Sequence, residues 1–530
     1  MKPSRLLRDL ARPDAYPHDA SDLEIIQTHI SVIALAGRYA YKVRKPVDLD
    51  FLDFTTLEKR LHDCREEVRL NRRLAPDVYL GVVPLVESER GLLVDAEGSP
   101  AEYAVKMERL PSEATLLERL LDNALEADVL RSLGRRIAAF HDRSESGPGI
   151  ARYGQWETVA GNARENLEQS AGHVPECVSD AVFRRLHDIL ELRLRELRSL
   201  IEDRARAGVP RDTHGDLHLD HVYLFPERRS PNDLVVIDCI EFNERFRYAD
   251  PVADMAFLVM DLKAHGRRDL AQVFEEAYFD EADDQEGRNL LSFYVSYRAA
   301  IRGKVAGFVA NDEEVPRDER RSAVRRARAH WLLALSELEE PGRRPCLVLV
   351  GGLPGTGKTT VSEVLAEDAG FEVVSSDRVR KGLAGLSAEA SGAASFGKGI
   401  YTPEWDDRTY EACLEEATQR VRQGKRVIVD ASFREEARRR TFLEAARDLG
   451  VRSLFFECRT APDVVRERIE GRRGGASDAD WSIYQAAAES WEVSDSELTR
   501  MRTRILDSAE GVEDVVKAAK SHLRGIGLVP

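Results

Sequence analysis

The chain has 530 residues, of which 43% are hydrophobic and 32% charged, and its formal net charge is −16 at pH 7. This length predicts several domains, and the composition is that of a globular protein rather than a disordered chain. The acidic balance argues against nonspecific wrapping of nucleic acid, although it leaves room for a local basic pocket. Six scattered cysteines without metal-ligand spacing predict reduced, mostly buried thiols in a cytoplasmic protein. We expect no signal peptide and no membrane span.

The first hundred residues predict a small part rich in β structure. The strand-like segments HISVIAL, YAYKVRK, GVVPLV and AEYAVKM surround one helical stretch at 56–74. From about 112 to 207 the pattern becomes helical, as in the leucine-rich segment ELRLRELRSLIEDRARAG. We therefore expect an α+β part with a β-rich lobe at about 1–108 and a larger helical lobe at about 109–341.

The segment THGDLHLDHVYL, residues 213–224, places three histidines and two aspartates within nine positions. One interpretation is a zinc site, because His214 and His218 are four residues apart. However, Gly215 favours a turn that leads into a strand, and the glutamate of a helical HExxH site is absent. We favour a phosphotransfer loop, in which Asp216 would face the hydroxyl group of an acceptor.

A phosphotransfer loop needs a second carboxylate, which binds Mg²⁺ from a downstream strand. The segment LVVIDCIEF supplies Asp238 at the end of an apolar run, and Glu241 follows nearby. A catalytic loop, a short strand, a turn and a metal-binding aspartate are the layout of eukaryotic-type kinases. The pattern therefore predicts phosphoryl transfer rather than zinc binding.

The segments HGDLH, IDCIEF and YADPVADMAFL resemble the aminoglycoside-phosphotransferase-like kinases, in particular a subgroup that is fused to a P-loop ATPase domain. The resemblance spans roughly 25–340 and implies a bilobal, protein-kinase-like fold. It implies that Lys42 holds the α- and β-phosphates of ATP and that Glu67 is its ion-pair partner. It also implies that Met107 lies in a hinge that meets adenine, and that Asp254 anchors the catalytic loop.

One position departs from that family. The family loop reads H-G-D-L-H-x-x-N, and its asparagine binds Mg²⁺, whereas this chain has His221 there. Three alternatives follow: Asp220 substitutes, a single Mg²⁺ suffices, or the domain is catalytically weak. A further hypothesis is that the N-terminal domain is not catalytic but binds ATP or another ligand and regulates the P-loop domain. His221 and Asp238 are therefore the candidate metal ligands of this domain.

The segment SELEEPGRRP, 336–345, separates a long predicted helix from an abrupt apolar run. Its prolines and glycine place a domain boundary near residue 342, between a domain at 1–341 and a domain at 342–530. Downstream, the runs CLVLV, FEVVS, RVIVD and SLFFE alternate with amphipathic helices. This alternation predicts an α/β domain with a parallel sheet and crossover helices.

The segment GLPGTGKT follows the first of these runs and fits the P-loop pattern G-x-x-x-x-G-K-[ST], with a helical pattern after it. Its backbone N–H groups would cradle phosphates at the start of a helix. Lys358 would reach the β- and γ-phosphates, and Thr359 would complete the Mg²⁺ shell. The predicted nucleotide-binding residues are Gly352, Leu353, Pro354, Gly355, Thr356, Gly357, Lys358, Thr359 and Thr360.

Further candidates lie where the next strands end, because ligands bind outside the carboxyl ends of parallel strands. Asp430 ends RVIVD and is a candidate Mg²⁺ ligand. Asp377 would take the proton of an acceptor hydroxyl while Arg380 holds the acceptor. Arg472, in a glycine-rich segment at 466–480, would neutralise the transferred phosphoryl group from a lid.

The P-loop and the S-D-x-x-R element resemble the small P-loop kinases over about 345–530. These include AAA- and zeta-toxin-like domains, gluconate- and chloramphenicol-type kinases and the phage-type polynucleotide 5′-kinase. The two resemblances imply a bifunctional kinase that uses ATP and Mg²⁺ and phosphorylates hydroxyl groups of small molecules such as sugars, amino sugars or aminoglycosides. A polynucleotide 5′-end is an alternative acceptor for the C-terminal domain. The identity of the acceptors and the oligomeric state stay open.

Overall fold

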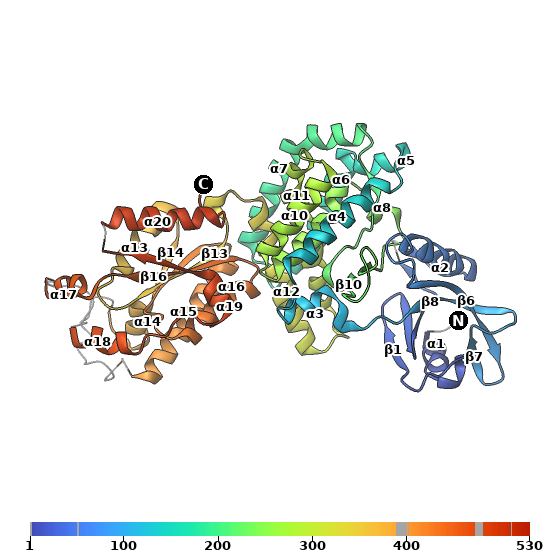
Figure 1. Cartoon of the computed structure of the whole chain (residues 1–530), viewed down its shortest axis with the longest axis horizontal. Helices are drawn as coiled ribbons and strands as arrows, with labels where there is room; N and C mark the ends of the chain where they lie inside the picture. The colour runs from blue at the N-terminus through green and yellow to red at the C-terminus, as the bar shows by residue number, and fades with distance from the viewer. Residues whose placement is uncertain (1–2, 50–51, 388–399, 401, 472–480, 510) are drawn as a thin grey trace. The chain divides into compact units, whose positions relative to one another are not determined.

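The computed structural model describes residues 3–49, 52–387, 400, 402–471, 481–509 and 511–530 (Figure 1). The chain divides into two compact units. The first comprises Met1–Gly161, Leu197–Leu262 and Arg268–Tyr294, and the second comprises Asn162–Glu196, Lys263–Arg267 and Val295–Pro530. The helices α6 (Trp156–Ser170), α7 (Asp180–Arg206) and α11 (Leu291–Asn311) each contribute residues to both units. A single domain boundary near residue 342 stays a prediction.

The first unit begins with a six-stranded antiparallel sheet, in the order β1-β2-β3-β8-β6-β7. The predicted strand segments correspond to β2, β3, β6 and β8, whereas β1 and β7 were not predicted. The strands are β1 (Glu24–Gln27), β2 (Ser31–Ala36), β3 (Tyr39–Arg44), β6 (Tyr79–Ser88), β7 (Gly91–Val94) and β8 (Pro100–Glu108). Helix α2 (Leu57–Asn71) packs against β6 and β8 (Figure 1).

Strand β3 has two different faces, because successive side chains of a strand point to opposite sides. Tyr41 and Val43 are fully buried in one apolar cluster, which also contains residues of α1 (Pro3–Leu10). Lys42 and Arg44 lie on the opposite face and bond to side chains of α2. The period of two thus places two cations of β3 against one helix.

The rest of the first unit is mainly helical and includes small antiparallel pairs, one of which joins β4 (Asp48–Leu49) to β5 (Leu52–Asp53). Helices α4 (Ala127–Arg143) and α10 (Arg268–Ala282) pack together, and α9 (Pro251–Ala264) is buried along most of its length. The pair of β10 (Val222–Leu224) with β11 (Leu234–Val236) follows the segment 213–221. A further pair joins β9 (Arg211–Asp212) to β12 (Tyr248–Ala249).

The second unit contains a five-stranded sheet, in the order β14-β15-β13-β16-β17, in which every pairing is parallel. The predicted parallel sheet is therefore confirmed. Its strands are β13 (Cys346–Gly352), β14 (Glu372–Ser375), β15 (Arg426–Asp430), β16 (Arg452–Arg459) and β17 (Thr503–Asp507). Helices α13 (Lys358–Ala369) and α20 (Val512–Gly525) pack on one face, and α14 (Ser376–Leu383), α15 (Pro403–Arg422) and α16 (Glu436–Asp448) lie on the other (Figure 1).

The upstream helices of the second unit are held to this α/β part by polar contacts. Arg185 of α7 donates to Glu339 Oε1 at 2.7 Å and to the Gly424 carbonyl at 2.7 Å. Glu339 directly follows α12 (Arg317–Leu338), whose last two turns are buried. Three short helices complete the unit: α17 (Pro462–Glu470), α18 (Trp481–Glu489) and α19 (Glu497–Arg502).

Two expectations about the whole chain can be compared with the structure. All six cysteines are buried and none forms a disulfide, as predicted. Within the ranges given above, no helix combines the length and the apolar character that crossing a membrane requires.

Candidate active sites

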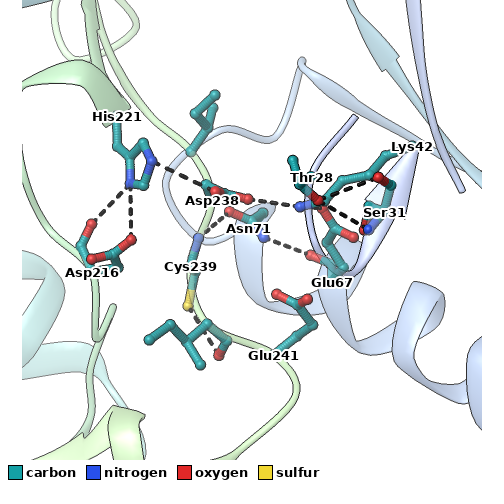
Figure 2. Close-up of polar contacts among 12 residues, drawn as sticks. Thr28, Ser31, Lys42, Glu67, Asn71, Asp216, His221, Asp238, Cys239 and Glu241 are labelled. Atoms are coloured by element: carbon teal, nitrogen blue, oxygen red, sulfur yellow. Dashed lines mark hydrogen bonds and ion pairs between the residues drawn. The ribbon is translucent and has the colours of Figure 1, made fainter. Parts of the chain in front are cut away.

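In the first unit, Lys42 lies between two carboxylates (Figure 2). Its Nζ is 2.8 Å from Glu67 Oε1 and 2.8 Å from Asp238 Oδ1. Burial alone would lower the pKa of Lys42, but Asp238 and Glu67 outweigh it and hold that pKa well above the ordinary value. Lys42 is therefore charged and fixed in place, and the predicted ion pair with Glu67 is present.

A second buried cation, Arg44, supports that pair and was not predicted. Its Nη2 donates to Glu67 Oε2 at 2.7 Å, and its Nε donates to Asp63 Oδ2 at 2.5 Å. Arg44 also bonds to Glu241 and to the Ser31 hydroxyl. Both carboxylate oxygens of Glu67 are thus occupied, so its orientation toward Lys42 is fixed by a network that is itself buried.

The turn at 213–216 is held by its backbone. Gly215 has φ of +86°, and a Cβ there would lie 2.9 Å from the Phe246 carbonyl oxygen, so only glycine fits. Asp254, at the start of α9, accepts hydrogen bonds from the N–H groups of Gly215 at 2.7 Å and His214 at 3.1 Å. His141 Nε2 lies 3.0 Å from the same carboxylate. Asp254 therefore makes the contacts with the turn that the predicted anchoring role requires.

Asp216 leaves this turn and meets His218. His218 Nε2 is 3.3 Å from Asp216 Oδ2, and its Nδ1 bonds to Asp220. Burial opposes a charge on the imidazole, but the hydrogen bonds to Asp216 and Asp220 raise the pKa of His218 to about 10. Although burial would raise the pKa of Asp216, the bond to His218 holds it well below the ordinary value. Asp216 is therefore an ionised carboxylate at neutral pH.

His221 lies between the two acids of the site (Figure 2). Its Nδ1 is 2.9 Å from the Asp216 carbonyl oxygen, and its Nε2 is 3.5 Å from Asp238 Oδ2. Asp238 has φ of +62°, and its N–H donates to the Tyr79 hydroxyl at 3.2 Å. Burial is outweighed by Lys42 and then His221, which together hold the pKa of Asp238 far below its usual range.

The donor groups of this site suit a divalent cation. Ligand atoms of Asp216, His218 and His221 all lie within 4.8 Å of one another. His218 is already bonded to two carboxylates, which argues against the zinc interpretation that used it as a ligand. The carboxylates of Asp216 and Asp238 are oxygen donors of the kind that Mg²⁺ and Mn²⁺ prefer, and imidazole adds a nitrogen donor that Mn²⁺ accepts more readily than Mg²⁺.

Met107, the predicted hinge residue, is half-buried near the end of β8. It pairs with Ala40 on β3 and with Tyr79 on β6. On the same strand, Val105 pairs with Lys42. The structure therefore places Met107 next to the strand that carries the lysine, one pleat away from it.

In the second unit, the P-loop connects β13 to α13 as predicted. Gly352 has φ of +147°, and a Cβ there would lie 2.5 Å from the Cys458 carbonyl oxygen, so the loop begins at a position that excludes side chains. The Thr356 hydroxyl closes the loop by donating to the Leu353 carbonyl at 2.8 Å. Lys358 is the first residue of α13. The N–H groups of this turn lie at a helix N-terminus, where phosphate binding is favoured.

The Mg²⁺ ligands predicted here lie together. The Thr359 hydroxyl donates to Asp430 Oδ2 at 2.8 Å. The other carboxylate oxygen, Asp430 Oδ1, is buried and has no hydrogen-bond partner among the described residues. Burial raises the pKa of Asp430, against the opposing effect of Lys358. A buried carboxylate oxygen without a partner beside a threonine hydroxyl fits a bound Mg²⁺ ion.

The structure brings Asp377 close to this site, and it pairs Arg380 with an acidic side chain. Ser375 is the register partner of Asp430, and the charge of Asp377 contributes to the pKa of Asp430. Asp377 pairs with Lys381 at 3.0 Å. Arg380 Nη2 is 2.6 Å from Asp406 Oδ1 on α15. Arg472, the predicted lid residue, lies outside the described residues.

A hollow of about 460 Å³ adjoins the P-loop and was not predicted. It is lined by Gly355 and Gly357 from the loop and by Arg468, Ser508 and Val512 from farther along the chain. Arg468 Nη2 donates to the Ser508 carbonyl at 2.6 Å, which joins α17 to the segment before α20. Ser508 and Val512 belong to no sequence motif, so only the fold reveals their place beside the P-loop.

Comparison with protein families finds two matches in this chain. Residues 52–290 match the model of the phosphotransferase enzyme family, and residues 347–492 match the model of an AAA domain. The chain is therefore a fusion of a phosphotransferase-family domain with a C-terminal P-loop domain, which confirms the resemblance found in the sequence.

The chain also has full-length relatives. Over 478 residues it is 32% identical to the uncharacterized proteins Rv2004c and MT2060 of Mycobacterium tuberculosis and Mb2027c of Mycobacterium bovis. Each alignment covers 90% of this chain and 91% of the relative. The chain belongs to the same family as these mycobacterial proteins.

Several solved structures resemble about a third of the chain. A gluconokinase from Sinorhizobium meliloti is 22% identical, with 35% of this chain and 95% of that chain covered and a TM-score of 0.27. A sugar kinase from Janibacter is 20% identical, with 34% and 94% covered and a TM-score of 0.28. Shikimate kinase from Aquifex aeolicus is 14% identical, with 34% and 98% covered and a TM-score of 0.24.

Proposed function

We propose that this protein is an ATP-dependent kinase with two nucleotide-binding sites, each of which transfers the γ-phosphate of ATP to a hydroxyl group of a small molecule. The observation that carries the proposal is Lys42 held between Glu67 and Asp238, with Asp216 across His221 from Asp238. Phosphoryl transfer requires three groups: a cation that binds the phosphates, a carboxylate that binds the metal, and a carboxylate that orients the acceptor hydroxyl. The sheet-and-helix layout around them supports a protein-kinase-like fold for this half.

In the first site, the protein acts mainly by positioning charge. Lys42 would bind the α- and β-phosphates, and Asp238, with His221 beside it, would hold the divalent cation. When bound, that cation neutralises charge on the phosphates. Asp216 would accept a hydrogen bond from the acceptor hydroxyl and orient it in line with the γ-phosphate. Because the pKa of Asp216 is so low, we expect the proton to leave the hydroxyl only as its bond to phosphorus forms.

In the second site, the P-loop N–H groups and Lys358 would hold the phosphates, while Thr359 and Asp430 would hold Mg²⁺. The hollow beside Arg468 and Ser508 is large enough for the nucleoside of ATP. Asp377 would orient the acceptor hydroxyl at the carboxyl end of the sheet. Sugars or amino sugars are our proposed acceptors for both sites. The pairing of Arg380 with Asp406 gives no support to a polynucleotide acceptor.

The test is a screen of a metabolite extract with γ-labelled ATP and the full-length protein. We expect Asp216→Asn and Lys358→Ala to abolish different labelled products, each by about 10²-fold or more, because each removes one site's positioning group. Asp188→Asn, at an 84% exposed aspartate of α7, is the matched control and should change neither.

Two outcomes would count against the proposal. If Lys358→Ala abolished every product and Asp216→Asn changed none, the first unit would be a regulator rather than an enzyme. If neither variant changed any product, neither site would be catalytic.

A further inference from the structure

The second unit contains another hollow, which has no residue in common with the one beside the P-loop. It has a volume of about 130 Å³ and lies among α12, α15 and the segment 175–182. Its apolar wall includes Val182, Trp331 and Leu332. Its polar lining includes Ser179, Arg328, Gln419, Arg422 and Gln423. No acidic side chain lines it among the described residues.

The two arginines of this hollow lack carboxylate partners. Among the residues that the structure describes, neither Arg328 nor Arg422 forms an ion pair, whereas Arg420 on the same helix pairs with Glu416 and Glu372. Arg328 donates only to the Glu176 carbonyl, at 3.0 and 2.8 Å. Arg422 Nε is buried and has no hydrogen-bond partner in the part of the chain that the structure describes. In an acidic chain, two arginines without carboxylate partners at one hollow indicate a binding site for an anion.

The two positive charges also act on each other. Burial, and then the charge of Arg422, lower the pKa of Arg328. Like charges that approach in a partly desolvated place raise the free energy of the folded chain. A dianion between the guanidinium groups would reverse the sign of that interaction, and it would give the buried Nε its missing acceptor.

We propose that Arg328 and Arg422 bind the phosphate group of a small phosphorylated metabolite, at a site distinct from both nucleotide sites. Phosphate fits better than a carboxylate because its two charges balance two guanidinium groups and its oxygens accept forked hydrogen bonds. The side-chain amides of Gln419 and Gln423 can add donors, whereas the hydroxyl of Ser179 already donates to the Arg422 carbonyl at 2.9 Å. The apolar wall takes the carbon part of the ligand, and the volume limits that part to a few atoms.

Isothermal titration calorimetry of the full-length protein tests the site. Every protein carries Lys358→Ala, which removes the cation of the P-loop and so weakens phosphate binding there. The probes are inorganic phosphate and glycerol 3-phosphate, with acetate as the carboxylate control. We expect Arg422→Gln and Arg328→Gln each to weaken phosphate binding by about tenfold or more, as loss of a charged donor predicts. Arg325→Gln, at an exposed position of α12, should leave it unchanged.

Arg422→Lys keeps the charge but loses the fork, so it should bind phosphate with intermediate affinity and guards against a folding defect in the glutamine variant. At low ionic strength, the melting temperature of the Arg422→Gln variant should be no lower than that of its parent. Phosphate should raise the melting temperature of the parent by more than it raises that of the variant. Equal affinity of the parent and both glutamine variants, or binding of acetate as tight as that of phosphate, would overturn the proposal.

Discussion

His221 is the residue on which the chemistry of the first site depends most directly, because its imidazole stands between Asp216 and Asp238. Imidazole favours Mn²⁺ over Mg²⁺ relative to an amide oxygen. We therefore expect Asp216-dependent phosphorylation to run faster with Mn²⁺ in the natural protein. His221→Asn should shift the ratio of Mg²⁺- to Mn²⁺-supported rates by about tenfold toward Mg²⁺. Initial rates at matched metal concentrations measure this.

The control for that experiment lies in the same chain. Products that depend on Lys358 come from a site with oxygen donors only, so their metal preference should not respond to His221→Asn. An unchanged ratio for the Asp216-dependent product would show that His221 does not touch the metal.

For single residues, the sequence predicted the site residues that lie within a recognisable strand, helix or apolar run. Lys42 lies on a strand, Glu67 on the next helix and Asp238 after an apolar run, and the structure joins all three. Arg44 could not be predicted. Its partner Glu241 is 197 residues away, and no local signal distinguishes a buried arginine from an exposed one. The same is true of His218, whose charge depends on two acids that happen to face it.

The element on which the catalytic turn rests is the first turn of α9. Asp254, which is fully buried, accepts from two consecutive N–H groups of the turn and contacts His141. An asparagine there would place its NH₂ group, which is a donor, against one of the backbone N–H donors of the turn. We expect Asp254→Asn to lower the free energy of unfolding by about 2–4 kcal/mol. Denaturant unfolding measures the change, and Asp128→Asn, at an 86% exposed helix position, should stay within about 0.5 kcal/mol of the parent.

A smaller effect than that of the exposed control would mean that the turn is held by its own backbone and by Gly215. In that case the activity of Asp254→Asn should also survive. Loss of activity with unchanged stability would instead give Asp254 a direct chemical role.

Elements were easier to predict than their order. Runs such as RVIVD and SLFFE are continuous and apolar because β15 and β16 lie inside a parallel sheet. Strand β17 (TRILD) was missed, since an edge strand exposes charged and apolar residues together: Ile505 is 54% exposed. Strand β1 (EIIQ), at one edge of the antiparallel sheet, escaped prediction for the same reason. Strand β7 (GLLV), at the other edge, is apolar and largely buried, and it was missed because it is only four residues long. The order of the strands in each sheet depends on pairing between residues that are far apart in the sequence. The periodicity of hydrophobic residues along the chain carries no information about such pairing.

For the whole molecule, two nucleotide sites imply a stoichiometry. We expect calorimetry with a non-hydrolysable ATP analogue and a divalent cation to find two sites per chain. Lys358→Ala should leave one site, and Lys42→Ala should leave the other, because each removes a phosphate-binding cation. Lys520→Ala, on the surface of α20, should leave both. If the natural protein bound one molecule of the analogue and Lys358→Ala abolished that binding, the first unit would be a domain that does not bind ATP.

The second unit is built from segments that lie far apart in the sequence, and this affects how the chain folds during synthesis. Arg185 bonds to the carbonyl of Gly424, which follows it by 239 residues. At 5–20 residues per second, a ribosome needs on the order of 10–50 s to cover that distance. Throughout this time α7, and in the later part of it also α12, lacks the surface on which it packs. The apolar faces of these helices therefore stay uncovered until the last third of the chain is synthesised, which makes the nascent chain a candidate client of chaperones.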